Sequence, residues 1–586
     1  MLKRFFISTL ATITGLWISF GLFFFLGMML IGLAASVGET ETVDVKNNSI
    51  LHVRLYGSVV ERYQPSTFID EVQGNNGPTF ALDEAIAAIK YAADDNNFEG
   101  IYLECDGLSA APASLAEIKQ ALDYFKASGK WIVAYSDNYS QGDYFLAACA
   151  DKVMVNPIGG IDIHGLSATT LYFKDLLDKL GVEAQIFKVG TYKSAVEPFM
   201  ISSMSDANRE QQVAYLGSIW DYTISAIAAD RNIAKDYVNQ NADSLLAFES
   251  ADEAVNRRFA DFCAYKHQAK EELMNRVGVD DEDELQLITP RQLCASVDMP
   301  HSKDNNNKIA VLYAYGDIVD SGSEGIVGPK VVKQIEEITE DDNIGGLVFR
   351  VNSGGGSAFA SEQIWEALER FKATGRPLYV SMGDYAASGG YYISCGADSI
   401  FALPTTLTGS IGIFGIIPCV EKTMKEKLGI NPQSVATNEN AGFSLMQSLT
   451  PQQRKQFQKN VERGYETFTG RCADGRGMTK DDIKAIAEGR VWVGSTALEL
   501  GLIDGFASLD DVIAKMADTL LYSDYQVVAY PKLKTDFWET WEEMKEDQVN
   551  AALKEQLGDN YMIYKQIREL QNMNPMQCRM DKVIIK

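Results

Sequence analysis

Histidine is scarce in this chain of 586 residues, which contains only four of them. They are His52, His164, His267 and His301, and none lies in a sequence setting typical of a catalytic base. A serine nucleophile needs a neighbouring group that removes its proton. If the chain uses such a serine, lysine is therefore the expected base.

Clusters of basic residues are also absent. The formal charge is −27 at pH 7, whereas proteins that bind nucleic acids present grouped lysines and arginines to the phosphates. The sequence therefore argues against a nucleic-acid partner, and solubility explains the acidic balance more simply.

The eight cysteines include no C-x-x-C pair and no spacing typical of metal ligands. No metal site or cofactor is therefore predicted. Outside the cytoplasm some of these cysteines could form disulfides, but their positions do not select the pairs.

The chain does contain one long uncharged run, from Phe5 to Gly38, directly after Lys3 and Arg4. A membrane-spanning helix needs about 20 apolar residues, and positive charges before a span keep that end in the cytoplasm. Residues 1–46 are therefore predicted to be a cytoplasmic tip, a transmembrane helix and a short linker. A cleaved signal peptide is the alternative, but its apolar region would be unusually long.

The remainder of the chain contains a domain-sized repeat. Three pairs of similar segments lie 246 or 247 residues apart: 97–103 with 343–349, 125–130 with 371–376, and 150–157 with 397–404. Each copy reads as a short apolar run, a helical pattern and another apolar run, which predicts β-α-β units and a largely parallel sheet. The expected fold class is therefore α/β, with one domain over residues 47–299 and another over 300–586. A helical pattern at Leu553, Leu557, Tyr561, Tyr564 and Ile567 predicts a C-terminal helical extension.

The two copies differ where the first strand of the unit ends. The second copy reads Asn352-Ser353-Gly354-Gly355-Gly356-Ser357, and the first copy lacks these glycines. Consecutive glycines after a strand let backbone N–H groups turn toward a ligand, as an oxyanion hole requires. A plain tight turn is the alternative.

Ser388 marks a second difference between the copies. It lies in Ala387-Ser388-Gly389-Gly390, between a predicted strand and a predicted helix, where the first copy has no such serine. A serine at such a turn exposes its hydroxyl, and the N–H of Gly389 can help to bind an oxyanion. The alternative is that Ser388 only caps the helix.

Lys193 lies in the first copy, in Gly190-Thr191-Tyr192-Lys193. A lysine acts as a base near neutral pH only if its pKa falls from about 10.4 to about 7 or 8. Burial at a domain interface would lower it. From the residues alone, an exposed loop lysine is the alternative, and Lys188 is an equally available candidate.

Glycines and apolar residues alternate over 407–415, which includes Ser410. This segment could form a sheet edge where an extended peptide adds a strand, with Ser410 hydrogen-bonding a buried amine. Simple core packing is the alternative.

The segments 190–199, 351–357, 386–391 and 407–415 together resemble the signal peptide peptidase A (protease IV) family in its long, tandem-domain bacterial form. The resemblance implies ClpP/crotonase-like domains, an anchor in the bacterial inner membrane, periplasmic catalytic domains and assembly as a homotetramer. It also implies roles for six residues: Ser388 as nucleophile, Lys193 as general base, Ser410 as the hydroxyl that orients the lysine, and the backbone of Gly355, Gly356 and Gly389 as oxyanion donors. The sequence departs from the family at Gly354, where proline is usual.

The predicted function is that of a membrane-anchored serine endopeptidase with a Ser/Lys dyad, which degrades cleaved signal peptides and other extended apolar peptides. It needs no cofactor. One alternative is an acyl-CoA enzyme on the same fold, which the acidic composition and the anchor disfavour. The other is a catalytically inactive, membrane-anchored peptide-binding scaffold or chaperone.

Overall fold

The structure is a computed structural model that describes residues 42–64, 77–322, 324–441, 444–532 and 576–580, with a few residues between 9 and 22. The predicted transmembrane span over 5–38 lies almost entirely outside these residues, as does the predicted helical pattern over 553–567. Among the helices that the structure describes, none is long and apolar enough to cross a membrane.

The first copy of the repeat forms a seven-stranded sheet in which every described pair of strands is parallel. The strands run β2-β1-β3-β4-β5-β7, with β8 also paired to β1. Their bounds are β1 Ser49–Val60, β2 Thr79–Ala81, β3 Phe98–Ser109, β4 Trp131–Tyr139, β5 Lys152–Ile161, β7 Phe262–Cys263 and β8 Leu287–Ile288.

Helices cover both faces of this sheet. Ile101 and Leu103 of β3 pack in the cluster that contains α3 (Leu82–Asp94) and α4 (Pro112–Ala127). Tyr102, which points to the opposite face, packs with α11 (Lys266–Val277). Because successive side chains of a strand alternate between faces, a strand covered on both sides reads as a continuous apolar run.

The second copy forms an eight-stranded sheet in the order β18-β16-β14-β12-β9-β20, with β15 paired to β14 and β19 paired to β15. All its pairs are parallel except that of β16 with β18. The bounds are β9 Lys308–Tyr315, β12 Ile344–Ser353, β14 Leu378–Ala387, β15 Ser399–Ala402, β16 Leu407–Gly409, β18 Val491–Val493, β19 Gly505–Phe506 and β20 Gln526–Tyr530.

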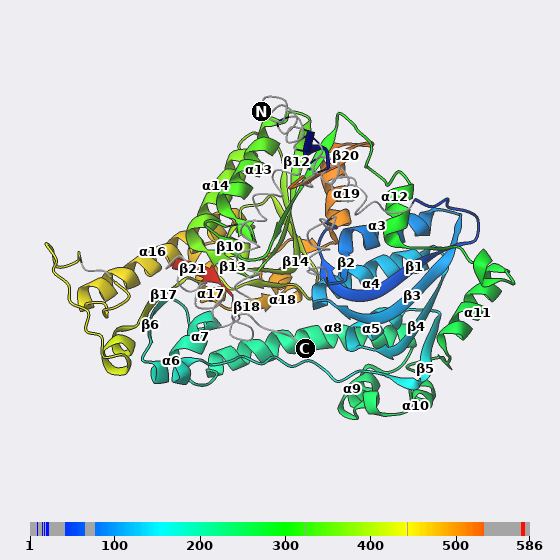
Figure 1. The fold of residues 1–586 in the computed structure, drawn as a ribbon, viewed down its shortest axis with the longest axis horizontal. Helices are drawn as coiled ribbons and strands as arrows, with labels where there is room; N and C mark the ends of the chain where they lie inside the picture. The colour runs from blue at the N-terminus through cyan, green and yellow to red at the C-terminus, as the bar shows by residue number, and fades with distance from the viewer. Residues whose placement is uncertain are drawn as a thin grey trace.

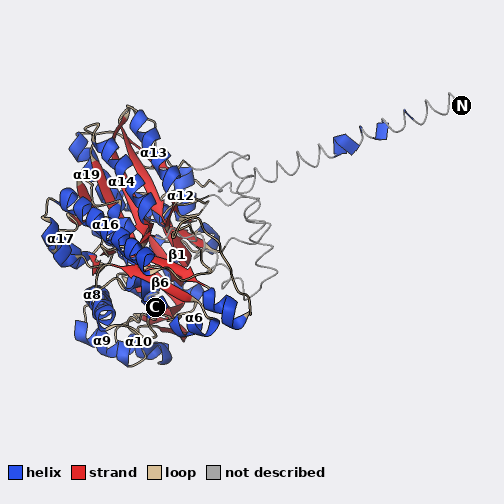
Figure 2. Cartoon of the chain, turned by 90° about the vertical axis from the view of Figure 1, so that its left-hand side faces the viewer, coloured by secondary structure: helices blue, strands red, loops and turns tan. Residues whose placement is uncertain are grey.

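The order of elements repeats between the copies. In the first copy α3, β3, α4, β4 and α5 (Gln141–Ala147) follow one another, and the second copy has α13 (Gly328–Glu340), β12, α14 (Ala358–Lys372), β14 and α15 (Gly389–Tyr392). The predicted α/β class and tandem arrangement are therefore confirmed. Figure 2 shows the strands running through the interior of the body with helices outside them.

A third sheet joins the two copies, in the order β11-β10-β13-β21-β17-β6. Its strands are β6 Glu183–Lys188, β10 Ile318–Val319, β11 Ile326–Val327, β13 Gly355–Ser357, β17 Phe414–Cys419 and β21 Met576–Arg579. Strand β6 belongs to the first copy and pairs antiparallel with β17 of the second. Separating the copies would therefore break a ladder of backbone hydrogen bonds.

The prediction that residues 407–415 provide a free sheet edge is wrong. Strand β16 pairs with β14 on one side and β18 on the other, and β17 lies between β6 and β21. Whether a strand lies at an edge depends on distant parts of the chain, which the local pattern of residues does not contain.

Helix α8 (Asp206–Arg231) runs beneath both copies (Figure 1). Its Gln211 side chain donates to the carbonyl of Tyr192 at 3.2 Å and accepts from the N–H of Val491 in β18 at 3.1 Å. One side chain thus connects the loop that carries Lys193 to the second copy.

Candidate active site

Ser388 lies at the turn between β14 and α15. Its backbone has φ 55° and ψ −112°, an uncommon conformation for a residue with a side chain. The N–H of Ser388 donates to the carbonyl of Gly409 at 2.8 Å, which holds the turn against β16. The Ser388 side chain makes no capping hydrogen bond to α15, so the helix-cap alternative is wrong and the hydroxyl points elsewhere.

The Ser388 hydroxyl points at Lys193, which comes from the other copy. Lys193 Nζ lies 2.7 Å from Ser388 Oγ, and the two side chains are 1% and 0% exposed. Lys188, the other lysine that the sequence offered, lies in β6 opposite Phe414. The fold thus brings Lys193 to Ser388 across 195 residues of sequence.

Ser410 completes a small buried cluster with these two residues. Lys193 Nζ lies 3.0 Å from the carbonyl oxygen of Ser410 and 3.1 Å from its Oγ. Ser410 Oγ in turn donates to the carbonyl of Gly489 at 3.3 Å. A neutral amine has two N–H donors and one lone pair, so two donors to Ser410 leave the lone pair to accept the Ser388 O–H.

Burial lowers the pKa of Lys193 to about 7 and outweighs the opposing influence of the Cys578 thiol. The amine is therefore largely neutral above pH 7. Neither a carboxylate nor a histidine hydrogen-bonds Lys193 among the described residues. An acidic neighbour would have kept the amine charged, and its absence leaves burial as the dominant influence.

Three glycines lie beside the Ser388 turn. The N–H of Gly355 donates to Ser353 Oγ at 3.1 Å, so it is already partnered, while Gly356 is paired in β13 with Ile318 and Cys578. Gly389 is the first residue of α15, where a backbone N–H has no partner within the helix.

Position 354, where the resemblance predicts proline, differs from position 356 in the space around it. A Cβ added there meets no atom within 4 Å, whereas one added at Gly356 would lie 2.0 Å from the carbonyl oxygen of Ile318. The loop therefore has room for a side chain at position 354 and none at 356.

Two glycines that the sequence analysis missed make room for the Lys193 side chain. A Cβ on Gly489 would lie 2.7 Å from Lys193 Cβ, and one on Gly412 would lie 3.2 Å from its Cδ. Gly489 also has φ 78°, which side-chain-bearing residues rarely adopt. The only sequence signal was a glycine between two charged residues, which is too common to single out.

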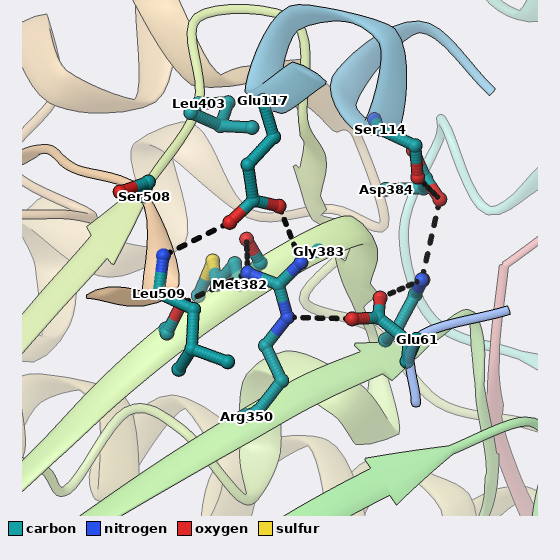
Figure 3. A network of polar contacts seen from close by, with 12 residues as sticks. Glu61, Ser114, Glu117, Arg350, Met382, Gly383, Asp384, Leu403, Ser508 and Leu509 are labelled. Carbon is teal, nitrogen blue, oxygen red and sulfur yellow. Dashed lines mark hydrogen bonds and ion pairs between the residues drawn. The ribbon is translucent and has the colours of Figure 1, made fainter. Parts of the chain in front are cut away.

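A second missed feature is a buried ionic network between the copies (Figure 3). Arg350 of β12 is 2% exposed, and its guanidinium donates to Glu61 at 2.9 Å and to Glu117 of α4 at 2.7 Å. Although burial opposes the charge of Arg350, these two carboxylates raise its pKa. Burial raises the pKa of Glu61, while Arg350 counteracts that effect.

The same network reaches the strands that carry the candidate site. Asn352 Nδ2 donates to Glu61 at 2.6 Å and to Asp384 at 3.2 Å. Asp384 accepts from both the N–H and the hydroxyl of Ser114, at the start of α4, at 2.8 Å each. Asn352 lies just before the glycine loop and Asp384 lies four residues before Ser388, so the network ties both segments to the first copy.

Comparison with known proteins agrees with this architecture. The model of peptidase family S49 matches residues 124–280 and 370–521, one segment in each copy. "Protease 4" of Haemophilus influenzae is 35% identical over 511 residues, covering 84% of this chain and 83% of that protein. "Protease 4" of Salmonella typhi is 35% identical over 521 residues, covering 85% and 82% respectively.

A more distant relative is the chloroplastic "Serine protease SPPA" of Arabidopsis thaliana, 26% identical over 486 residues, covering 80% of this chain and 69% of that protein. The predicted resemblance to the protease IV family is thereby confirmed. The match in both copies and the identity over most of the length show that this chain belongs to peptidase family S49 and is a serine protease of the tandem-domain type.

Proposed function

We propose that the chain is a membrane-anchored serine endopeptidase in which Ser388 is the nucleophile and Lys193 the general base. The observation that carries the proposal is the 2.7 Å contact between Lys193 Nζ and Ser388 Oγ in a fully buried setting. The low pKa of Lys193 supports it, because a neutral amine can accept the serine proton.

In the proposed reaction Lys193 Nζ takes the proton of Ser388 Oγ while the oxygen attacks the carbonyl carbon of a peptide bond. The carbonyl oxygen becomes an oxyanion, which the N–H of Gly389 would bind. The N–H of Gly355 donates to Ser353 Oγ and Gly356 is paired in β13, so either glycine would contribute only after leaving its present partner. When the C–N bond breaks, the Lys193 ammonium gives its proton to the leaving amine. Lys193 then takes a proton from water, whose oxygen attacks the acyl carbon. The bond to Ser388 Oγ breaks, the acid product leaves, and Lys193 returns the proton to Ser388 Oγ.

Ser410 acts in this scheme by orienting the lysine. Its carbonyl and hydroxyl oxygens accept the two N–H groups of the neutral amine, which leaves the lone pair directed at Ser388. These two hydrogen bonds favour the orientation in which the amine faces the nucleophile.

The proposed substrates are cleaved signal peptides and other extended apolar peptides. The proposed anchor over residues 5–38 would place the N-terminus in the cytoplasm and the catalytic domains in the periplasm, beside the bilayer that holds such peptides. Resemblance to the protease IV family supports these assignments and assembly as a homotetramer.

A serine-directed probe tests the nucleophile. Incubation with a fluorophosphonate is expected to modify Ser388 alone, as seen by mass spectrometry of the digested protein, and to abolish hydrolysis of a fluorogenic signal-peptide sequence. The label forms because the activated hydroxyl attacks phosphorus as it attacks a carbonyl. Modification of another serine would contradict the assignment, and peptide binding with neither label nor cleavage would favour the scaffold alternative.

The pH dependence of hydrolysis tests the base. Because the pKa of Lys193 is lowered to about 7, kcat/KM is expected to rise about tenfold per pH unit below pH 7 and to level off above it. The thiol of Cys578 also influences the pKa of Lys193, but burial raises the pKa of that thiol to about 12, so it stays neutral over this range. Circular dichroism over the same range controls for unfolding, and an acid limb centred near pH 4 would assign the base to a carboxylate instead.

A further inference from the structure

A short turn of the second copy holds the loop that carries Lys193. The turn comprises residues 488–490 and lies directly before β18. The carbonyl of Glu488 accepts from the N–H of Tyr192 at 3.0 Å, and its carboxylate accepts from the N–H of Thr191 at 3.3 Å. The backbone of the Lys193 loop is therefore fastened to the second copy at the two positions before the lysine.

The same turn also holds Ser410. The N–H of Ser410 donates to the carbonyl of Arg490 at 2.7 Å, and its hydroxyl donates to the carbonyl of Gly489 at 3.3 Å. One short segment thus fixes both the lysine loop and the residue whose oxygens contact the lysine amine. A change in how the loop lies on this turn would change the approach of Lys193 to Ser388.

The Arg490 side chain fastens the turn to the loop a second time. Its guanidinium lies over two aromatic rings, with Cζ 4.6 Å from the ring centroid of Tyr192 and 4.4 Å from that of Trp492. It also pairs with Glu210 of α8 at 3.0 Å, and the Tyr192 hydroxyl donates to the same carboxylate at 3.2 Å. Arg490 therefore joins two residues of the first copy to the second copy, directly beside Lys193.

Stacking accounts for an arginine at this position. A planar guanidinium stacks on aromatic rings while it pairs with a carboxylate, whereas the compact ammonium of a lysine does not stack in this way. The side chain of Arg490 is only 21% exposed, and its buried Nε has no hydrogen-bond partner among the described residues. The rings thus contribute much of what holds the guanidinium in place.

We infer that Arg490 is a positioning residue for the proposed general base, because its guanidinium, stacked on Tyr192 and Trp492, holds the Lys193 loop on the 488–490 turn. The inference rests on the proposed function for the role of Lys193. Without the stacked guanidinium the loop is expected to loosen and to let water reach the amine. The pKa of Lys193 would then rise from about 7 toward its ordinary value of about 10.4.

The pH dependence of hydrolysis tests this role. In Arg490→Met the acid limb of kcat/KM is expected to move up by at least about one pH unit. A shift of about one unit lowers kcat/KM about fivefold at pH 7 and hardly at pH 9, where the amine is largely neutral in both proteins. Arg276→Met is the matched control: Arg276 also stacks on a tryptophan, Trp131, and pairs with Glu272, but it lies in α11 on the first sheet. Its acid limb should remain at the wild-type pH.

Arg490→Lys separates stacking from charge. Removing a cation would by itself favour protonation of a nearby amine, whereas this variant keeps the positive charge beside Glu210 and loses only the planar stack. Its acid limb should also move up, and it covers the case in which circular dichroism shows that Arg490→Met does not fold. The other titratable groups around the loop and the amine, Glu488, Tyr192 and Cys578, are the same in both variants.

Two results would overturn the inference. An acid limb that stays at the wild-type pH in both folded variants, whatever their loss of activity, would make Arg490 a structural residue only. An acid limb that moves in Arg490→Met and stays in Arg490→Lys would reduce the effect to charge.

Carbon-13 NMR of protein labelled at lysine Cε measures the amine without catalysis. The resonance that is missing in Lys193→Met belongs to Lys193, and its titration midpoint is expected to rise by at least about one pH unit in Arg490→Lys. An unchanged midpoint would overturn the inference. If Lys193→Met stayed active, or the wild-type acid limb lay far from pH 7, only the proposed function would fail, because the midpoint would still show whether Arg490 positions the amine.

Discussion

Replacing Ser388 by alanine or Lys193 by methionine is expected to lower kcat/KM for peptide hydrolysis by about 10,000-fold. Ser388→Ala removes the proposed attacking oxygen. Lys193→Met removes the one side-chain nitrogen that, among the described residues, hydrogen-bonds this oxygen, at 2.7 Å. Because the two groups act as one unit, the double variant should be no worse than either single variant. Steady-state hydrolysis of a fluorogenic signal-peptide sequence measures all three.

Lys188→Met is the matched control for this experiment. It makes the same substitution in β6, where Lys188 lies opposite Phe414 rather than beside Ser388, and it should change kcat/KM by no more than about twofold. If Lys193→Met retained activity comparable to that of Lys188→Met, Lys193 would not be the base.

Lys193→Met should also not destabilise the protein. With its pKa lowered to about 7 in the fold, the lysine binds fewer protons folded than unfolded, and at pH 8 this costs about 3 kcal/mol of stability. Methionine removes this cost and loses three hydrogen bonds worth about 1 kcal/mol each. The two effects nearly cancel, so the Tm should be essentially unchanged.

The second large effect is expected from Arg350→Met, which should lower the free energy of unfolding by about 3–5 kcal/mol. The substitution leaves Glu61 and Glu117 buried without their cationic partner, and the exposed fractions of their side chains are only 9% and 2%. Urea denaturation followed by circular dichroism measures the loss.

Arg370→Met is the control for Arg350→Met. Arg370 pairs with Glu366 and Glu336 on the surface, with its side chain 51% exposed, and such pairs contribute at most about 1 kcal/mol. A loss for Arg350→Met no larger than that for Arg370→Met would show that the network is not needed to hold the copies together.

The deficit of Arg350→Met should shrink as the pH falls from 8 to 5. Without the guanidinium, burial is the main influence on Glu61 and raises its pKa further above the unfolded value, so the folded state binds protons more readily than the unfolded state. Protonation of Glu61 therefore stabilises the folded variant at low pH, and this stabilisation is lost as the pH rises. A deficit that does not change over this range would argue against buried, unpaired carboxylates as its cause.

Much of the fold could be predicted because its signals are local. The apolar runs that became β3, β4, β12 and β14 and the helical patterns that became α4 and α14 lie within short windows, and the repeat shows that one pattern was used twice. Ser388 and Ser410 could be singled out because residue type and flanking glycines indicate chemistry, whereas Lys193 was preferred to Lys188 through the resemblance of residues 190–199 to the protease IV family.

The rest depends on contacts between distant parts of the chain. Residue type and local setting alone do not distinguish Lys193 from Lys188. The pairing of β6 with β17 places Lys188 opposite Phe414, while Lys193 reaches Ser388. Gly489 matters only because Lys193 packs against it. The ion pairs of Arg350 join residues 289 and 233 positions apart, and the place of β21 between β13 and β17 has no local signature.

The spread of the site over both copies has a consequence for how the protein is made. The amine of Lys193 leaves the ribosome 195 residues before the hydroxyl that it contacts, and the Gly489 backbone that confines it comes later still. All strands of the first sheet belong to the first copy, so this sheet can form before the second copy is made. At that stage Lys193 has no Ser388 hydroxyl to contact. With the proposed dyad, catalytic competence arises only when the second copy has been made and has docked, so an unfinished chain would carry no assembled site with which to cut its neighbours.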